Sequence, residues 1–393
     1  MASTQPPPTF SVRNHYVPKW YQRRFFEPGQ GQTHLWYLDL HPDPIEIPKQ
    51  PRKFRKAVRH LGPVNCFVQD HLYTLFFGAM ATDAIEKQFF GAIDTIGETA
   101  VAFYSNYDWK IKGAREAYHG ISAYLGAQLF RTPKGLESLR LISKSKDSQV
   151  ALHALQHVLP MYQAIWAESV WEVVQCKQSP TKFILCDTPV TMYNKGIFPA
   201  HTDIRQFTAA HVARLGTHTL FPLDLEHCLV LTNLQYVRNP AVNPVKEREN
   251  PRFFQSGLFD LRKVQRSREL PEEEVVAINY VLKTMARRYV AAPRKDWLYP
   301  EGSLTSKFWG RLGGKYFLMP DPRFVTFSTA FYAGYKDGGA WGTNEYGHRD
   351  PDNPRAVALR EIEWKTFQAH KAAWDERDRL AGREPPHVSL DYL

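Results

Sequence analysis

The sequence predicts an α+β fold, in which an N-terminal hairpin, a helical block, an antiparallel strand block and a closing helix follow one another. Apolar residues alternate at 33–47 and again at 217–232, whereas between these segments they recur at helical spacing. Strands and helices therefore form separate blocks, unlike the alternation that builds a parallel βαβ sheet. The density of glycine and aromatic residues after residue 300 predicts an appended β-rich C-terminal subdomain.

The first elements are a hairpin and a helix. Alternating apolar residues on both sides of a Pro-Asp-Pro turn predict two paired strands within residues 33–47. Asp83 and Glu86 have the spacing of a capping box. They open a helix that we expect to end near residue 105.

Two further helices complete the helical block. Helical spacing over residues 113–130 predicts a helix that ends at Thr132-Pro133. A longer helix over residues 147–176 follows. We expect a kink or break at Pro160, because proline cannot donate the hydrogen bond of a helix interior.

The strand block and the closing helix come next. Residues 183–186 predict a short buried strand that ends at Asp187, and residues 217–223 and 228–232 predict a strand pair. Residues 271–290 predict the closing helix, whose first turn holds three glutamates placed favourably for the helix dipole.

Composition divides the chain into three parts. Residues 1–9 predict a disordered lead, residues 10–300 the α+β domain, and residues 301–393 a Gly- and aromatic-rich subdomain that ends in a charged helix at about 354–382. Within the α+β domain, residues 234–265 mix asparagine, proline and charge, which predicts a long exposed loop or lid.

The bulk composition points to a globular protein without a membrane partner. Hydrophobic residues make up 43% of the 393 positions, ample for a packed core, yet no apolar run is long enough to span a bilayer. The N-terminus lacks the features of a secretory signal. Four cysteines without a C-x-x-C pair suit free thiols in a reducing compartment, so we expect a cytoplasmic protein.

The positive charge is clustered. The net charge of +10 favours an acidic partner, and lysines and arginines gather at residues 49–59, 262–268 and 283–295. Phosphate backbones bind such runs through charge and counterion release. Each run would equally suit a solvated surface.

The N-terminal segment places titratable and cationic groups close together. Pro18 pushes Val17 out of the α region and allows a helix to begin directly after it. His15 would then lie on an extended segment that leads into a helix carrying Arg23 and Arg24. This layout suits an anionic ligand.

Several segments share a pattern with a known family. They are N-H-Y-V-P-K-W-Y-Q-R-R-F from Asn14, Q-L-F-R-T-P from Gln128, C-D-T-P-V from Cys186, F-P-L through C-L-V-L from Phe221, and the helix around Asn279. In this order, over about residues 10–300, they resemble an uncharacterised family with an HYVP hallmark, the domain of unknown function 4238. The resemblance implies one fold unit and a set of polar residues, and it implies no activity. Cys186 and Thr188 depart from the serine and asparagine usual in the family.

The polar residues that the resemblance selects could serve phosphodiester cleavage. His15 would be the general acid or base, and Glu86 and Asp187 would orient it or hold a divalent ion, Mg²⁺ or Mn²⁺. The substrate's phosphates would be held by cationic and amide side chains of the same segments and by the first basic run. From the segments these are Asn14, Arg23, Arg24, Gln128 and Arg131, and from the basic run Lys53, Arg55 and Lys56. The sequence thus favours a nuclease-like enzyme that acts on nucleic acid or a nucleotide, and a role in defence or as a toxin would be in keeping.

A non-catalytic protein is the main alternative. The same polar residues would then form a structural network, and the basic runs would bind RNA, DNA or an acidic partner. Several aromatic residues could stack on bases beside the basic runs, although core packing is the commoner use of such residues. They are Trp20, Trp36, Tyr73, Trp166, Trp171, Trp309 and Trp341. Contact between His15, Asp187 and Arg131 in one cleft would favour catalysis, whereas side chains tied to backbone groups would favour binding.

A metal-dependent oxygenase in the helical block is a minor alternative. Glu116 and His119 form an E-x-x-H pair, and His153 and His157 lie on one helical face. Carboxylate-bridged di-iron bundles use two E-x-x-H pairs, and this segment offers one. Phosphate-binding loops, dinucleotide fingerprints, zincin motifs and nucleophile elbows do not occur in the sequence, which argues against those enzyme classes.

Overall fold

The chain is described by a computed structural model. It describes residues 13–233 and 258–312, with gaps at residues 30, 46–52, 71, 73–74, 78–79, 83–90, 109, 146–147, 168, 215, 260 and 262–263. Beyond these it describes residues 327–328, 330–334, 340–344, 354, 358, 376 and 380. The predicted lead, Glu86, most of the predicted loop at 234–265 and most of the predicted charged C-terminal helix lie outside the described residues.

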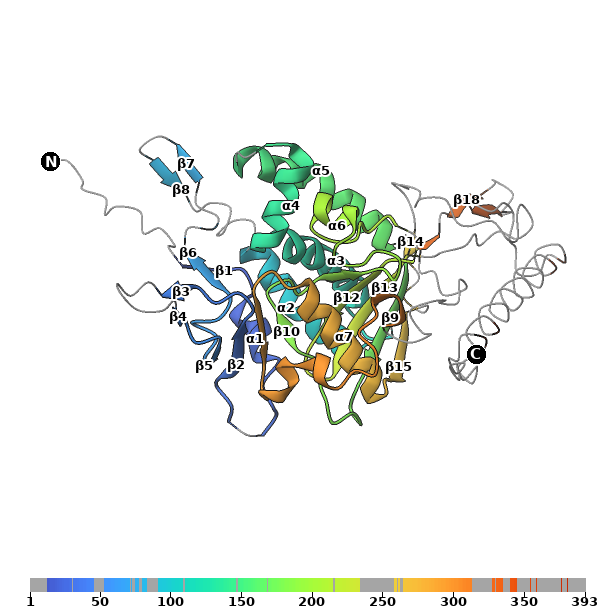
Figure 1. Ribbon diagram of the computed structural model, residues 1–393. Helices are drawn as coiled ribbons and strands as arrows, with labels where there is room; N and C mark the ends of the chain where they lie inside the picture. Colours follow the sequence, from blue (N-terminus) through green and yellow to red (C-terminus); the bar gives the residue numbers. More distant parts are fainter. Residues whose placement is uncertain are drawn as a thin grey trace.

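The fold is α+β, with two main sheets beside a helical block (Figure 1). The four-stranded sheet is antiparallel and has the order β10-β16-β2-β5, formed by Leu185–Cys186, Tyr289–Ala292, Leu35–Asp39 and Val58–Leu61. The five-stranded sheet has the order β11-β12-β13-β9-β15, formed by Thr191–Tyr193, His218–Pro222, His227–Thr232, Val170–Gln175 and Gln265–Glu269. Strand β15 is parallel to β9, and the other pairs of this sheet are antiparallel.

A block of helices lies beside these sheets (Figure 1). The helical block contains α2 to α6, which are Gly91–Ser105, Ala114–Phe130, Pro133–Ser143, Ser148–Ala167 and Thr202–Phe207. Figure 1 shows α3, α4 and α5 gathered away from β2 and β5. The short α1, Lys19–Arg23, begins directly after Pro18 as predicted. None of the described helices combines the length and apolarity needed to cross a bilayer.

The remaining elements are short. Paired strands are β1 Arg13–His15 with β6 Val68–Asp70, β3 Pro44–Ile45 with β4 Lys53–Phe54, β7 Leu75–Phe77 with β8 Met80–Thr82, β14 Leu258–Phe259 with β17 Phe327–Ser328, and β18 Ala330–Gly334 with β19 Ala340–Asn344. Three 3₁₀ turns follow β16, at Asp296–Leu298, Pro300–Gly302 and Trp309–Arg311. The β18–β19 pair agrees with the strands predicted after residue 300.

The closing helix joins the two sheets. Helix α7, Glu272–Met285, contacts β10 of the four-stranded sheet and β11 of the five-stranded sheet. Its buried Asn279 accepts a hydrogen bond from the Ile184 amide (3.1 Å) and donates one to the Lys182 carbonyl (2.8 Å). The amide side chain thus satisfies backbone groups just before β10, as buried polar groups require.

Aromatic side chains fill the core between α1, α3 and the five-stranded sheet. Tyr21 stacks on Phe221 with ring centroids 5.3 Å apart, and Trp20 lies 5.3 Å from Tyr124. Trp166 and Trp171 are also buried, so they pack the core and present no surface for stacking. The four cysteines are buried and carry free thiols.

The hairpin predicted within residues 33–47 is wrong in its pairing. Both strands exist, but β2 pairs with β5 on one side and β16 on the other, and β3 pairs with β4. Strand β2 is largely buried and needs a partner at each edge, whereas β3 is exposed. Burial of β2 in the middle of a sheet therefore overrides the local turn signal.

Two predicted helix ends are also wrong. Helix α5 continues through Pro160 without ending there, and it stops at Ala167 because residues 170–175 form the buried strand β9 against β13. Helix α7 stops at Met285, five residues before the predicted end, because Ala286 adopts extended backbone angles and the chain then enters β16. In both cases pairing within a sheet outweighs apolar spacing that also fits a helix.

Candidate functional site

His15 lies at the end of β1, which pairs with β6. The ring Nε2 lies 3.1 Å from the carbonyl oxygen of Val64. Because a carbonyl oxygen can only accept, Nε2 carries the hydrogen and donates a hydrogen bond to that oxygen. Burial lowers the pKa of His15, and the positive charges of Lys19 and Arg13 lower it further. The ring is therefore neutral at pH 7, with one nitrogen committed to the backbone.

Gln128 and Arg131 hold the N-terminal segment against α3. The amide of Gln128 donates to the Tyr16 carbonyl at 2.8 Å. The guanidinium of Arg131 donates to the His15 carbonyl at 3.3 Å and pairs with Asp94. Both side chains are buried, so they stabilise the entry of the chain into the fold. Asn14 is buried in the same segment.

Asp187 lies in the loop between β10 and β11, and its carboxylate accepts three backbone hydrogen bonds. The donors are the amides of Arg287, Arg288 and Tyr289, at 2.9, 2.6 and 2.9 Å. Burial raises the pKa of Asp187, and these amides and Lys134 offset part of that effect. The contacts of Asp187 thus go to the turn between α7 and β16, while those of the His15 ring go to Val64.

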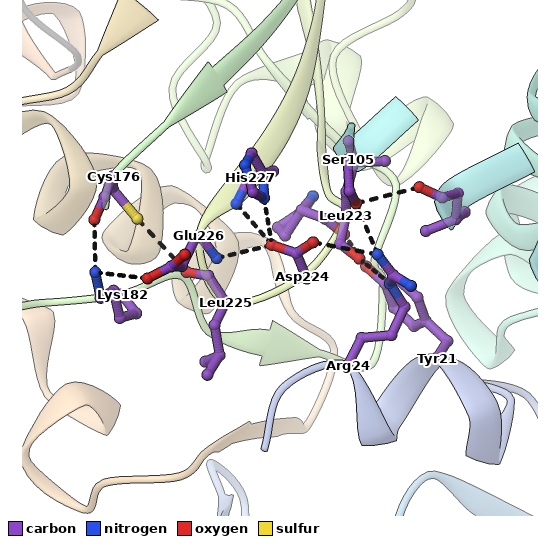
Figure 2. A network of polar contacts seen from close by, with 12 residues as sticks. Tyr21, Arg24, Ser105, Cys176, Lys182, Leu223, Asp224, Leu225, Glu226 and His227 are labelled. Carbon is purple, nitrogen blue, oxygen red and sulfur yellow. Dashed lines mark hydrogen bonds and ion pairs between the residues drawn. The ribbon is translucent and has the colours of Figure 1, made fainter. Parts of the chain in front are cut away.

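Arg23 and Arg24 have different surroundings. Arg23 is exposed. Arg24 donates to the Leu223 carbonyl (2.7 Å) and to Ser105 Oγ (2.7 Å), and it pairs with Asp224 (3.2 Å). Figure 2 shows how these bonds tie the residue after α1 to the end of α2 and to the β12–β13 turn.

Asp224 and His227 complete this network (Figure 2). The carboxylate accepts hydrogen bonds from the Glu226 amide, the His227 amide and the His227 ring, at 2.9, 2.8 and 2.9 Å. Burial opposes ionisation of Asp224, but the His227 ring, the Ser105 hydroxyl and the Glu226 amide together outweigh it and hold the pKa of this carboxyl below its usual value. Sequence reasoning missed this pair, although Asp-x-x-His in a tight turn is a local signal that could have found it.

The described residues do not assemble the metal site that the oxygenase alternative would need. Glu116, His119 and His157 are exposed, and only the backbone of His153 is described. No three His, Cys, Asp or Glu side chains gather closely enough to hold a metal ion within the described part of the chain.

The three basic runs differ in how many of their side chains bond to other parts of the protein. In the second run, Arg266 donates to the Tyr107 carbonyl (2.6 Å), and Arg268 pairs with Glu172 (3.0 Å) and Glu274 (3.2 Å). In the third, Lys283 pairs with Glu301 (2.7 Å), Arg288 with Asp39 and Asp43 (2.9 Å each), and Arg294 with Glu27 (2.6 Å). These side chains stabilise the fold.

The first run stays on the surface. Lys53, Arg55 and Lys56 are exposed, and Phe54 between them exposes 57% of its area. The run leads into β5, the edge strand of the four-stranded sheet, where Arg59 and His60 are also exposed. Charge and an exposed ring therefore occur together along one sheet edge.

The sheet brings Lys295 of the third run to the same surface. Strand β2 lies between β5 and β16, so Trp36 is opposite His60 on one side and Ala292 on the other. The rings of Trp36 and His60 lie 4.8 Å apart, and His34 stacks on His60 at 5.3 Å. Lys295 Nζ lies 5.8 Å from the Trp36 ring. We call the group His34, Trp36, His60 and Lys295, with residues 53–56, the basic aromatic surface.

A family model described as "Protein of unknown function (DUF4238)" matches residues 13–296. The chain belongs to this family. The DUF4238 match extends from β1 to the first 3₁₀ turn, and so contains both main sheets and the basic aromatic surface. Neither the curated proteins nor the solved structures contain a match.

Proposed function

We propose that this DUF4238 protein binds single-stranded nucleic acid on the basic aromatic surface. The observation that carries the proposal is the group of rings His34, His60 and Trp36, with Lys295 over the Trp36 ring. The exposed run at residues 53–56 leads into β5, the strand that carries His60. Cationic side chains attract phosphates, and exposed rings stack on unpaired bases. A duplex hides its base faces, so the rings favour a single strand.

The distribution of charged side chains around the four-stranded sheet supports this proposal. Asp39 and Asp43 lie next to the surface, and Arg288 pairs with both carboxylates. Its single positive charge offsets one of the two negative charges, and Arg55 also interacts with Asp43. Lys295, Arg55 and Lys56 are exposed, and they supply the positive charge that a phosphate backbone would meet.

Binding without cleavage is the better-supported form of the proposal. The groups that the sequence suggests for cleavage bond to backbone, His15 to the Val64 carbonyl and Asp187 to three amides. A carboxylate with both oxygens occupied is a weak candidate for holding a metal ion or orienting a histidine.

Fluorescence anisotropy with labelled oligo-dT and oligo-rU tests binding. We expect Arg55→Glu/Lys56→Glu to weaken the affinity about tenfold or more, since two phosphate attractions become repulsions. We expect His60→Ala to weaken it about fivefold, because one stacking ring is lost. The matched control Lys112→Glu/Arg115→Glu makes the same charge change at exposed positions near the start of α3 and should bind like wild type. Equal affinities for all four proteins would reject the proposed surface.

The nuclease-like alternative is tested on the same oligonucleotides with added Mg²⁺ or Mn²⁺. On the binding proposal, the oligonucleotides stay intact with wild type and with His15→Ala. Cleavage by wild type that disappears in His15→Ala would instead support the enzymatic alternative and the role assigned to His15 by sequence.

A further inference from the structure

A small cavity lies where two of the sequence motifs meet. Its volume is about 30 Å³, and it lies between the start of α4, helix α5 and the residues after β10. The residues that matter for its chemistry are Thr132, Lys134, Tyr162, Thr188, Thr191 and Met285. Thr132 follows the Q-x-x-R motif directly, and Thr188 belongs to the C-D-T-P-V motif. The basic aromatic surface contributes none of these residues.

Lys134 is the reactive group of this cavity. Its Nζ donates a hydrogen bond to the Met285 carbonyl at the end of α7. The residue as a whole is half-buried, and its amine lies among the residues that line the cavity. Three hydroxyls around it donate to backbone carbonyls: Thr132 to Leu129, Thr191 to Thr188, and Thr188 to Met285 at 3.5 Å. Among the residues that line the cavity, Lys134 is the one that carries an amine.

We propose that Lys134 forms a reversible imine with a small carbonyl compound in this cavity. The amine nitrogen attacks the carbonyl carbon, the C–O bond breaks, and water leaves as the C=N bond forms. The two N–H hydrogens of the uncharged amine leave with the carbonyl oxygen as that water, and a proton taken up from solvent gives the imine one positive charge. Asp187, which already interacts with the Lys134 ammonium, would stabilise that charge.

The electrostatics of the cavity favour this chemistry. Burial lowers the pKa of Lys134 to about 8, although Asp187, Cys186 and Glu137 act in the opposite direction. Burial also keeps the Cys186 thiol and the Tyr162 hydroxyl protonated by raising the pKa of each. Roughly one Lys134 side chain in ten is then uncharged at pH 7, against fewer than about one in a thousand for an ordinary lysine.

The size and lining of the cavity restrict the ligand. A volume of about 30 Å³ holds roughly two waters. Apolar side chains such as Phe130 and Met192 line the rest. The cavity therefore suits an aldehyde or ketone with one short apolar substituent.

Reductive trapping tests the proposal in the folded wild-type protein. Acetaldehyde and cyanoborohydride convert an imine to an ethylated lysine, which peptide mass spectrometry locates. The exposed Lys110 and Lys112 serve as internal controls. We expect Lys134 to be modified at least about tenfold faster than either control at pH 7, with this ratio falling toward pH 10 as ordinary lysines also lose their protons. Modification of Lys134 at or below the control rate, or only in urea, would overturn the proposal.

A second variant links the reactivity to the cavity. Ala209 lines the cavity, so Ala209→Leu should fill part of it. We expect this change to slow modification of Lys134 severalfold while Lys112 reacts as before, with circular dichroism confirming the fold. An unchanged Lys134 to Lys112 ratio in this variant would show that the aldehyde does not bind in the cavity.

Discussion

At the scale of single residues, the polar side chains that the sequence selects mostly bind backbone. Asp187 accepts hydrogen bonds from the backbone amides of residues 287–289. Gln128 donates one to the Tyr16 carbonyl, and Asn279 bonds to the backbone of both Lys182 and Ile184. Each bond joins segments that are far apart in the chain. Such residues are required because a buried amide or carbonyl without a partner costs stability. Their chemistry resembles that of a catalytic set, although their contacts are structural.

Asp187→Ala tests this interpretation. The substitution leaves three buried amides without an acceptor, so we expect it to lower the free energy of unfolding by about 3–5 kcal/mol. Asp187→Asn keeps one carbonyl oxygen and should cost less. Urea denaturation measures both, with the exposed Glu116→Gln as the control. A stable Asp187→Ala protein would show that the carboxylate is dispensable for the fold and would restore a functional role for it.

At the scale of elements, the junction between α3 and α4 is held by local chemistry and close packing. Thr132 is the N-cap of α4 and accepts the Gly135 amide at 3.0 Å, and Pro133 occupies the first helical position. Gly135 packs directly on the last turn of α3. A β-carbon added there would lie 2.1 Å from the Leu129 oxygen and 2.6 Å from the Phe130 α-carbon.

Gly135→Ala should therefore destabilise the protein strongly. The two atoms in conflict are backbone, so relief requires α3 and α4 to separate, and we expect a loss of about 3 kcal/mol or more. Gly302→Ala is the matched control, because an added β-carbon there meets nothing within 4 Å. It should change stability by less than about 1 kcal/mol. Thermal unfolding compares the two variants, and equal melting temperatures would contradict the packing described for this junction.

At the scale of the whole molecule, the sheets decide which charges meet. Strand β2 lies between β5, where the first basic run ends, and β16, which leads to Lys295 more than 200 residues later in the chain. Internal acids pair with several of the other cationic side chains. The positive side chains behind the net charge of +10 are thus not all free to contact a partner, because part of them pair with acids of the protein. A polyanion would meet this charge mainly at the basic aromatic surface.

The salt dependence of oligonucleotide binding measures how much of this charge is used. Each phosphate contact to a single strand contributes about 0.7 to the slope of log affinity against log salt. We expect Arg55→Gln/Lys56→Gln to reduce the magnitude of the slope by about 1.4. Lys112→Gln/Arg115→Gln should leave it unchanged. An identical slope in both double variants would mean that residues 55 and 56 make no phosphate contact.

The sequence by itself determined the elements whose signals are local. Helix α3 ends where Thr132-Pro133 predicts, β12 pairs with β13 across a tight turn, and the start of α7 follows from its proline and three glutamates. Caps, turns and apolar spacing act within a few residues, so one segment is enough to reveal them. The α+β class followed from the same signals, and the structure confirms it. The resemblance to an uncharacterised family rested instead on motif segments in a fixed order, and the family model confirms that family.

Only the tertiary structure decided the partners of β2, the conversion of residues 170–175 into β9, and the bonds of His15 and Asp187. Each depends on a segment far away in the chain, because sheet pairing and burial select among local conformations of similar energy. Lys134 is the clearest example at the candidate sites. Nothing in its neighbours along the chain marks it as unusual. Its lowered pKa arises from burial by segments that the fold brings to it, and Asp187 acts in the opposite direction.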